Sequence, residues 1–556
     1  MLKVESTGRL FSWSFVLKKF ISKGAKTLKQ AKKITGILCL LTLFYSCSYD
    51  FVDDVIKDRE VENRVPVIPS TNPKKAWTIM HYSDADCSLE IDIINDVRQM
   101  KFGFAPNEDL NLIVLIDRHP DHHNDEITFG ENFSDTRLYK ITSDKATRIN
   151  GGKEFPEITT KSLYEANMGD ANTLRKFINM CKTEYPAEHY ALIISNHGGG
   201  PRKKSSSALK SENPLTKEIS LDETNGGDVL YLGEISDVLS DEQSVDLLGF
   251  DACLMGSLEI AYQFRPNYLR EGGGGFSADY LVASAPLEVG AGWDYANILA
   301  RITVGETPRY EVSEVTGGDL EKKYSPLDLT PKDLGAVIVE EQHDSTVEEY
   351  DQSLSLYDLS RVFDVKTAVD DLAVAIDQSN TKIAFENIRG RDREPVSLYY
   401  FAIPKDPTNA DFYSIWEETP FFDVYDLAER VFYNESNFPA SVISRAEILM
   451  KAVDDLVVHS FAGDLFSYRT FQSNFKQGKN GIHIFFPDGS KVNAKNEPMW
   501  INQWWYTSRN LYKERGDPHY YGNIDFCNYN NNGQVDSWVE MLDKWYDPTG
   551  DYNIPY

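Results

Sequence analysis

Cysteine is scarce in this sequence, and its few copies are scattered. Six of the 556 residues are cysteine, and four of them follow residue 80: Cys87, Cys181, Cys253 and Cys527. A disulfide framework needs several cysteines in a short chain, and a zinc site places two of them within a few residues of each other. The spacing therefore excludes both, and a single cysteine in a special setting becomes the more informative pattern.

Positive charge is also in short supply. The chain has 57 Lys and Arg against 86 Asp and Glu, which gives a net charge of −29 and a pI of about 4.8. A general nucleic-acid binder needs a basic face, so this composition argues against nucleic acid as a partner. The hydrophobic fraction of 41% suffices for a large core. The length predicts two or three domains.

Long hydrophobic runs are missing too. The longest candidate, "ITGILCLLTLFYSC" (34–47), follows a lysine-rich stretch and has roughly 13 apolar residues, which suits a signal peptide better than a membrane span. The segment resembles a bacterial lipoprotein signal over residues 1–47, with Cys47 as the lipid-bearing residue and 48–74 as a tether. An ordinary secretory signal is the alternative. We therefore expect a protein of the cell envelope, lipid-anchored at the outer membrane or cell surface, or a secreted one.

Beyond the tether, short apolar runs alternate with helical patterns. The expected elements are strands at 76–84, 110–117, 189–195 and 245–250 and helices at 88–101, 170–185 and 231–241. This alternation predicts an α/β fold with a mostly parallel sheet between helices over 75–300. Residues 301–556 predict helices at 358–377 and 444–463 and a strand at 480–487. We interpret them as an α+β region packed on the first.

Two of the strands end at residues that carry chemistry. "ALIISNHG" (191–198) ends in a histidine and a glycine, and "DLLGFDACLM" (246–255) leads into a cysteine. The carboxyl ends of parallel strands share one edge of a sheet, so His197 and Cys253 are expected to meet there. A cysteine beside a helix N-terminus favours the thiolate, and a histidine can serve as its acid–base partner. Gly198 leaves room for a carbonyl, so the Gly198 and Cys253 N–H groups predict an oxyanion hole.

These strand ends resemble those of the clostripain-like cysteine peptidases, which are relatives of caspases, gingipains and legumains. Further segments look like the family's, in the family's order: "WTIMHYSDADCSLE", "NMGDANTLRKFI", "ADYLVASAPLEVGAGWDY" and "NGIHIFFP". The resemblance covers roughly 75 to 487. It implies a caspase-like α/β/α sandwich and a cysteine endopeptidase acting on polypeptides. In that reading Cys253 is the nucleophile, and His197 protonates the leaving amine.

The resemblance also implies where a substrate side chain binds. Asp251 matches the acid that the family places in the pocket for an arginine or lysine, and it implies cleavage after those residues. Ser284 is expected to line the same pocket. Where the family usually has Ser-Glu-Glu, this chain has Ser284-Ala285-Pro286, so two acids are missing and the choice between Arg and Lys stays open. Asp251 could instead cap the helix after the cysteine.

Self-cleavage is a further expectation from the resemblance. The stretch 198–218 lies between the histidine and cysteine segments and is rich in Gly, Ser and Lys, which predicts an exposed loop. The candidate cleavage sites are Lys210, Arg202, Lys203 and Lys204. We expect a monomer or a self-cleaved two-chain form.

Two other stretches contain metal-binding residue types. "DRHPDHHNDE" (117–126) could bind a divalent metal, although a solvated loop is favoured. "NYNNNGQVDSWVE" (528–540) resembles a calcium loop, but Val539 stands where such a loop needs its bidentate Glu. Some members of the resembled family need calcium. No metal site is assigned, and the sequence leaves a calcium requirement open.

Two other functions fit the same sequence. The chain could be a non-catalytic surface protein that binds polypeptides on this fold, or a transpeptidase that passes the acyl group to an amine. A binding protein has no need for both His197 and Cys253, so their presence favours the enzyme. A transpeptidase needs the same pair and stays open.

Overall fold

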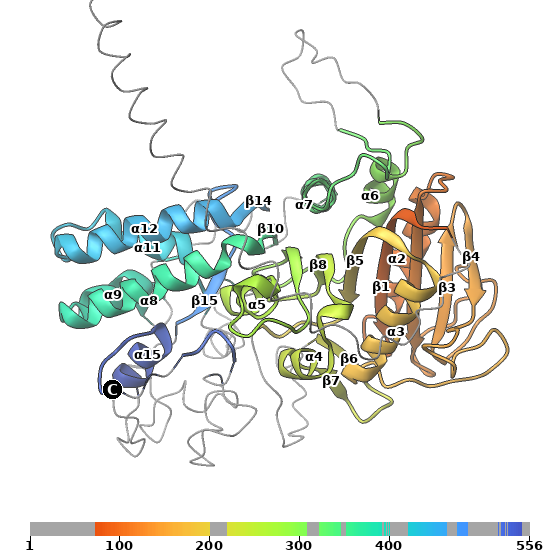
Figure 1. The fold of residues 1–556 in the computed structure, drawn as a ribbon, viewed down its shortest axis with the longest axis horizontal. Coiled ribbons are helices and arrows are strands. Elements are labelled where there is room, and N and C mark those ends of the chain that lie inside the picture. The colour runs from red at the N-terminus through yellow and green to blue at the C-terminus, as the bar shows by residue number, and fades with distance from the viewer. Residues whose placement is uncertain are drawn as a thin grey trace, which may run out of the picture. The chain divides into compact units, whose positions relative to one another are not determined.

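A nine-stranded sheet runs through the chain, in the order β14-β10-β9-β8-β5-β1-β2-β3-β4 (Figure 1). The central strands are mutually parallel: β2 (Leu110–Arg118), β1 (Lys75–Ala85), β5 (Ala187–Ser195), β8 (Val245–Asp251) and β9 (Ala278–Ala283). An antiparallel pair completes each side: β3 (Arg137–Thr142) with β4 (Lys145–Ile149), and β10 (Ser353–Asp358) with β14 (Val457–Ala462). The predicted α/β class with a mostly parallel sheet is confirmed.

This computed structural model describes most of the chain after the tether. The described residues are 73–200, 219–307, 322–345, 352–391, 394–395, 397–398, 400, 421–463, 475–486, 521, 524–528, 530 and 532–546. The expected lipidation site Cys47 and the four self-cleavage candidates, Arg202, Lys203, Lys204 and Lys210, lie outside them. No helix among the described residues is long and apolar enough to cross a membrane.

Helices cover both faces of the sheet. One layer contains α2 (Glu90–Gly103), α6 (Tyr295–Ile302) and α7 (Pro331–Ser345). The other contains α3 (Ala171–Glu184), α4 (Leu232–Val238), α5 (Leu258–Gln263), α8 (Val362–Gln378), α11 (Val424–Phe432) and α12 (Ala440–Leu456). Strand β1 contributes side chains to the hydrophobic cores on both faces of the sheet. Trp77 and Ile79 pack in the core under the first helix layer, and Met80 and Tyr82 pack in the core under the second. The alternation of side chains along a strand produces the two cores.

Smaller elements complete the described fold. Two-stranded ladders pair β6 (Ile219–Asp222) with β7 (Asp228–Leu230), β11 (Gly390–Arg391) with β12 (Glu394–Pro395), and β13 (Phe421–Asp423) with β15 (His483–Phe485). Among the described residues, the remaining α-helices are α9 (Lys382–Arg389) and α15 (Trp538–Tyr546). Ladder β6–β7 matters for the site, because it follows β5 directly among the described residues.

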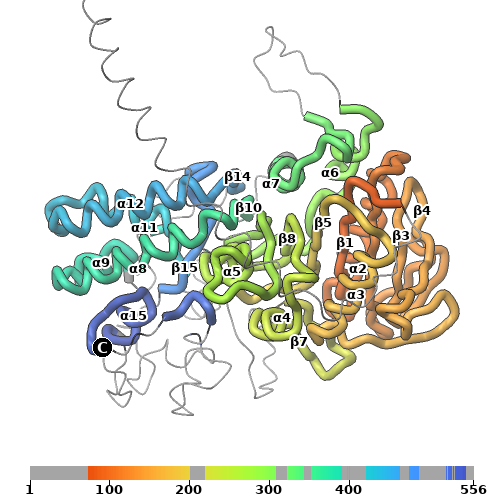
Figure 2. Tube along the Cα trace, viewed as in Figure 1, coloured from red at the N-terminus to blue at the C-terminus, as the bar shows by residue number. Residues whose placement is uncertain are grey.

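The sheet continues across residue 300, where the sequence places a border between two regions. The chain returns through β10 and β14 to extend the sheet beyond β9. Figure 2 shows β10 and β14 side by side, on the same side of β8 as the helices α8 and α12. The predicted helix 444–463 is wrong at its end, since α12 stops at Leu456 and β14 follows. Val457 and Val458 are β-branched, and pairing with β10 stabilises them as a strand.

Candidate active site

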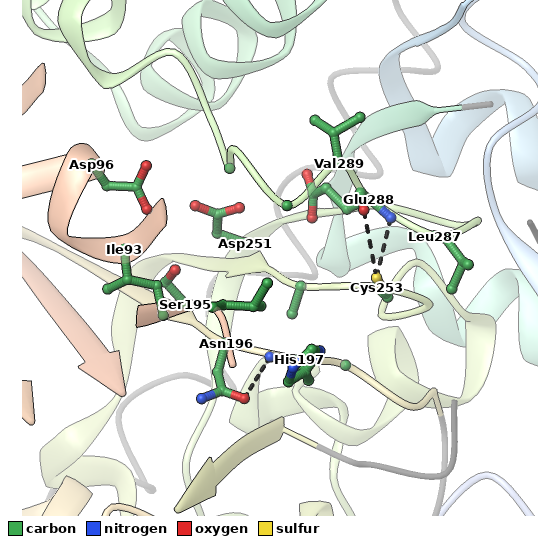
Figure 3. A pocket seen from close by; sticks show the side chains of 15 residues that line it. Ile93, Asp96, Ser195, Asn196, His197, Asp251, Cys253, Leu287, Glu288 and Val289 are labelled. Atoms are coloured by element: carbon green, nitrogen blue, oxygen red, sulfur yellow. Dashed lines mark hydrogen bonds between the residues drawn. The ribbon is translucent and has the colours of Figure 1, made fainter. Parts of the chain in front are cut away.

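His197 and Cys253 leave the sheet at neighbouring strand ends. β5 and β8 pair in parallel, and the last pair in register is Ser195 with Asp251. Both residues line a pocket of about 250 Å³ at this edge (Figure 3). The other lining residues are Leu89, Ile93, Asp96, Ser195, Asn196, Gly198, Asp251, Ala252, Leu287, Glu288, Val289, Gly290 and Gly292. The structure thus brings the predicted histidine, cysteine, glycine and aspartate together.

Gly198 lies against the backbone of Cys253. A Cβ atom built on Gly198 would come within 2.0 Å of the Cys253 carbonyl oxygen and 2.8 Å of its amide nitrogen. No larger residue fits without moving one of the two strand ends. The glycine therefore allows the close backbone approach that a pair of N–H donors to one oxyanion requires.

Cys253 does not sit on a helix N-terminus. Leu254 turns the chain with φ of 63°, and α5 begins at Leu258 with Ser257 as its cap. The Glu288 N–H donates to the Cys253 Sγ at 3.2 Å, and the thiol faces the Glu288 carbonyl at 3.8 Å. Burial raises the pKa of Cys253 to about 12, although the Glu288 N–H opposes the shift. The expectation that a helix terminus favours the thiolate is therefore wrong for this state.

The segment before His197 is fixed by its neighbours. Asn196 donates to the Asp84 carbonyl at 2.6 Å, and its own oxygen accepts the Leu221 N–H at 3.0 Å. Asn196 thus ties the end of β5 to β1 and β6. The His197 Nε2 lies 2.9 Å from the Ser88 Oγ, a partner that the sequence analysis did not single out.

Three carboxylates share the pocket beside the thiol. Asp251 comes from β8, Asp96 from α2, and Glu288 from the loop after β9. Figure 3 shows Glu288 beside Cys253 and Asp251 between Glu288 and Asp96. Burial raises the pKa of each: to about 6 for Asp251 and well above the usual value for Asp96 and Glu288, which the neighbouring acids raise further. Such a cluster favours a positively charged ligand.

Uncharged side chains hydrogen-bond to two of these carboxylates, so they orient the acids without supplying a positive charge. The Tyr295 hydroxyl donates to Asp251 Oδ2 at 2.7 Å, and the Trp293 ring N–H donates to Glu288 Oε1 at 2.7 Å. Among the described residues, Asp96 Oδ1 is buried without a hydrogen-bond partner. Gly292, at φ of 66°, leaves space over the acids, because a Cβ there would lie 3.0 Å from Asp251 Oδ2.

Of these three acids, the sequence analysis identifies Asp251 but not Asp96 or Glu288. Asp251 is the last residue of β8 and directly follows an apolar run, a signal that the sequence shows. Glu288 lies just past the Ser-Ala-Pro segment, and Asp96 lies inside a helix, so only the fold brings them to the pocket. This chain lacks the two acids that the family pattern has at residues 285 and 286, and two carboxylates from other positions, Asp96 and Glu288, line the pocket.

Ser284 does not lie where the sequence analysis expected. It is fully buried, it does not line the pocket, and its hydroxyl donates to the Pro286 carbonyl at 3.2 Å. Its carbonyl accepts the Gly256 N–H at 2.7 Å. The structure therefore gives it a place in the loop that carries Glu288 rather than a contact with substrate.

The two candidate metal stretches have different surroundings. In the stretch 528–540, the Glu540 carboxylate already accepts the N–H groups of Asn530 and Asp536, at 2.6 and 2.8 Å. In the histidine loop, His119 and His122 come within 4.8 Å of each other and of Glu223 at ligating atoms. Neither stretch contributes to the pocket of Cys253.

Cysteine hydrolases typically place a cysteine and a histidine together at a pocket. Here the two residues lie at adjacent strand ends and line the same pocket. The clostripain family model matches residues 81–545, and the chain belongs to this family. It is 43% identical over 509 residues to clostripain of Hathewaya histolytica, across 89% of this chain and 92% of that protein. The chain is therefore a cysteine endopeptidase, a hydrolase with polypeptide substrates, as its sequence indicates.

Solved structures of related proteins are also similar. A secreted C11 cysteine protease from Bacteroides thetaiotaomicron, bound to an irreversible peptide inhibitor, is 15% identical over 79% of this chain and 99% of that one, with a TM-score of 0.46. An inactive zymogen C11 protease from Parabacteroides distasonis is 15% identical over 74% and 93%, with a TM-score of 0.46. The comparisons give no support to the binding-protein or transpeptidase alternatives.

Proposed function

We propose that this endopeptidase cleaves peptide bonds after Arg or Lys, with Cys253 as nucleophile and His197 as acid–base partner. The observation that carries the proposal is the group of three carboxylates, Asp96, Asp251 and Glu288, in the pocket of the thiol. A guanidinium or ammonium group in that pocket would relieve the repulsion between the acids, and carboxylates pair strongly with such cations.

The proposed reaction proceeds in two stages, through a thioester. The Cys253 sulfur attacks the carbonyl carbon, and its proton passes to His197. The carbonyl oxygen becomes an oxyanion that accepts hydrogen bonds from the Gly198 and Cys253 N–H groups. His197 then gives the proton to the leaving amine, so the C–N bond breaks and a thioester remains. Water, deprotonated by His197, hydrolyses the thioester and restores the thiol.

The raised pKa of Cys253 gives substrate binding a second role. With a pKa of about 12, the free enzyme holds a neutral thiol at pH 7. Burial is the main cause, and the charges of Glu288 and Asp251 add to it. A cationic side chain paired with those acids lowers their effect on the sulfur. A basic residue thus helps to form the nucleophile that attacks next to it.

A labelling experiment tests the pocket and the nucleophile together. Peptide chloromethyl ketones ending in Arg, Lys or citrulline, which resembles Arg without its charge, are incubated with the full chain. We expect the Arg or Lys probe to alkylate Cys253, as located by mass spectrometry, and the citrulline probe to react far more slowly. Asp251→Asn should slow the basic probes only. Equal labelling by citrulline, or an adduct elsewhere, would contradict the proposal.

Self-cleavage belongs to the same proposal. Lys210 and the cluster Arg202, Lys203 and Lys204 lie between β5 and β6, beyond the histidine and before the cysteine. Intact-mass spectrometry of the purified chain and of the Cys253→Ala variant detects the cut. If the chain cleaves itself, the parent gives two fragments and the variant stays uncut. Cleavage of both would show that another protease makes the cut.

We also propose that Cys47 carries a lipid that holds the protein in the cell envelope. The support is the lysine-rich and apolar sequence before Cys47. Growth of producing cells with an alkyne-labelled fatty acid, followed by capture of the protein, measures the lipid. Cys47→Ser should lose the label and be found in the medium. Label retained by that variant would remove the assignment.

A further inference from the structure

A buried histidine from the C-terminal half of the chain lies behind the turn that follows Cys253. His483 is the first residue of β15 and is 0% exposed. Its backbone N–H donates to the Gly256 carbonyl at 3.0 Å, and its ring Nε2 lies 3.2 Å from the Leu254 carbonyl oxygen. The ring does not line the pocket of Cys253. One residue thus holds the cysteine turn through both its backbone and its side chain.

The turn itself has an unusual backbone conformation. Leu254 has φ of 63°, in the left-handed region that residues with a Cβ rarely adopt. Its N–H donates to the Pro286 carbonyl at 2.8 Å, so hydrogen bonds hold both its N–H and its carbonyl. Such strained residues persist only where their surroundings over-determine them. Leu254 directly follows Cys253, so its conformation helps to fix the backbone that carries the thiol.

The imidazole of His483 has one hydrogen-bond task in the described part of the chain. A carbonyl oxygen can only accept, so Nε2 carries the proton that binds Leu254. Burial lowers the pKa of His483 to about 3, so the ring is neutral and Nδ1 has no proton. Within the same described part, Nδ1 is buried without a hydrogen-bond partner. An unpartnered acceptor lowers stability, so packing alone would favour a ring without nitrogen, such as phenylalanine.

A second ring completes the support behind the turn. Phe421, from β13, stacks on His483 with ring centroids 4.3 Å apart and planes inclined by 22°. A Cβ built on Gly200 would lie 3.1 Å from Phe421 Cζ and 3.4 Å from the Leu254 carbonyl oxygen. Gly200 lies three residues after His197. The two stacked rings therefore lie beside both the histidine segment and the cysteine turn.

We propose that His483 is a positioning residue for Cys253, because its Nε2–H holds the Leu254 carbonyl and with it the left-handed turn behind the nucleophile. This role rests on the proposed function, in which the Cys253 sulfur attacks and its N–H binds the oxyanion. Loss of the hydrogen bond should slow the chemical step, since the sulfur and N–H lose their alignment. It should affect substrate binding less, because Asp96 and Glu288 lie on other elements.

Two substitutions separate the hydrogen bond from the packing of the ring. His483→Phe keeps a flat ring against Phe421 and removes the donor, whereas His483→Gln loses the ring and keeps an N–H donor of similar reach. On an Arg peptide, the Phe variant should lower kcat at least about tenfold and change KM less than about twofold. The Gln variant should restore most of kcat, which a role in packing alone does not predict.

Tyr400→Phe is the matched control. It removes a buried hydroxyl, bound to Asp423 Oδ2 at 2.6 Å, whose ring lies 6.2 Å from that of His483. Because the Leu254 carbonyl keeps its donor, kcat should stay near that of the parent. Thermal melts identify folded variants, and His483→Met, a second side chain without a donor, replaces the Phe variant if that one does not fold.

Labelling by the Arg chloromethyl ketone distinguishes failure of this inference from failure of the proposed function. A parent chain that is not alkylated at Cys253 contradicts the proposed function. When the parent is alkylated there, full kcat in a folded variant without the donor would overturn the positioning role. A loss of kcat that Gln does not restore, or an equal loss in Tyr400→Phe, would overturn it as well.

Discussion

At the scale of single residues, burial controls the ionisation of the pocket. Asp251 is buried, the hydrogen bonds from Tyr295 and Trp293 limit the rise in its pKa, and the result is a pKa of about 6. Above pH 6 the carboxyl is charged and can hold a basic side chain. Below pH 6 it is neutral, and that attraction is lost.

The pH dependence of cleavage follows from this value. For a substrate with Arg before the scissile bond, kcat/KM should fall as the pH drops through about 6, because the free enzyme protonates Asp251. This fall, the acid limb of the pH profile, is checked by measuring cleavage rates of a fluorogenic Arg peptide between pH 5 and 8. In Asp251→Asn the limb should be absent, on a much lower plateau. An unaltered limb in that variant would assign it to another group.

We expect Asp96 to lower the stability of the fold while it contributes to the binding of basic substrates. Burial and the charges of Asp251, Asp92 and Glu288 raise its pKa, so ionisation costs the folded state free energy, and stability falls as the pH rises through the pKa. Asp96→Asn should therefore raise the free energy of unfolding at pH 8 relative to the parent. It should also reduce kcat/KM for Arg substrates by at least about tenfold, since the pocket loses charge. Denaturant melts and kinetics on one preparation test both signs, and a destabilised variant with unaltered selectivity would refute the account.

At the scale of elements, the start of α6 controls the pocket through Tyr295. Its hydroxyl donates to Asp251 Oδ2 at 2.7 Å and lies 2.8 Å from the His81 Nε2 in β1. Burial lowers the pKa of His81 to about 3, so this ring is neutral. With Tyr295 donating to Asp251, His81 must supply its Nε2–H to the tyrosine oxygen. A buried chain of hydrogen bonds thus connects the sheet to the carboxylate.

Tyr295→Phe should act on Asp251 and not only on packing. Without the hydroxyl, the charged carboxylate loses a hydrogen bond, so the pKa of Asp251 should rise and the acid limb of kcat/KM should move above pH 6. We expect KM for Arg peptides to increase several-fold with a smaller change in kcat. Trp77→Phe, in the same core and remote from the pocket, is the control. A limb that stays in place would make Tyr295 merely structural.

An element can be predicted from the sequence when the residues that determine it lie within the element itself. The runs that became β1, β2, β5 and β8 are largely apolar, and most of their residues are buried, so composition alone marks them. The same property identifies His197 and Cys253, because they follow such runs. The sequence predicts a helix where β14 forms, because the strand depends on pairing with β10, which is distant in sequence. Asp96 and Glu288 were missed for the same reason, as they meet Asp251 only after folding.

At the scale of the whole molecule, the C-terminal half supports the catalytic half. β10 and β14 extend the sheet past β9, and the loop after Cys253 is braced from β15. His483 donates its backbone N–H to the Gly256 carbonyl at 3.0 Å, and its ring lies 3.2 Å from the Leu254 carbonyl. The sheet and the cysteine loop therefore both depend on residues beyond 350.

A chain ending at residue 300 should not fold into an active enzyme. It would leave β9 as an unpaired edge and remove the contacts of His483, and exposed apolar edges promote aggregation. We expect the fragment to be insoluble or aggregated by size-exclusion chromatography, and to lack labelling by the Arg probe. The full chain prepared in parallel is the control. A monomeric fragment labelled as fast as the full chain would show that the first 300 residues are self-sufficient.

The measurement that tests the central claim most directly is a profile of cleavage sites. The full chain and its Cys253→Ala variant are each incubated with the same mixed peptide library, and the products are read by mass spectrometry. The account predicts cuts after Arg and Lys by the parent and none by the variant. Cuts after uncharged residues at comparable rates, or cuts that persist in the variant, would contradict it.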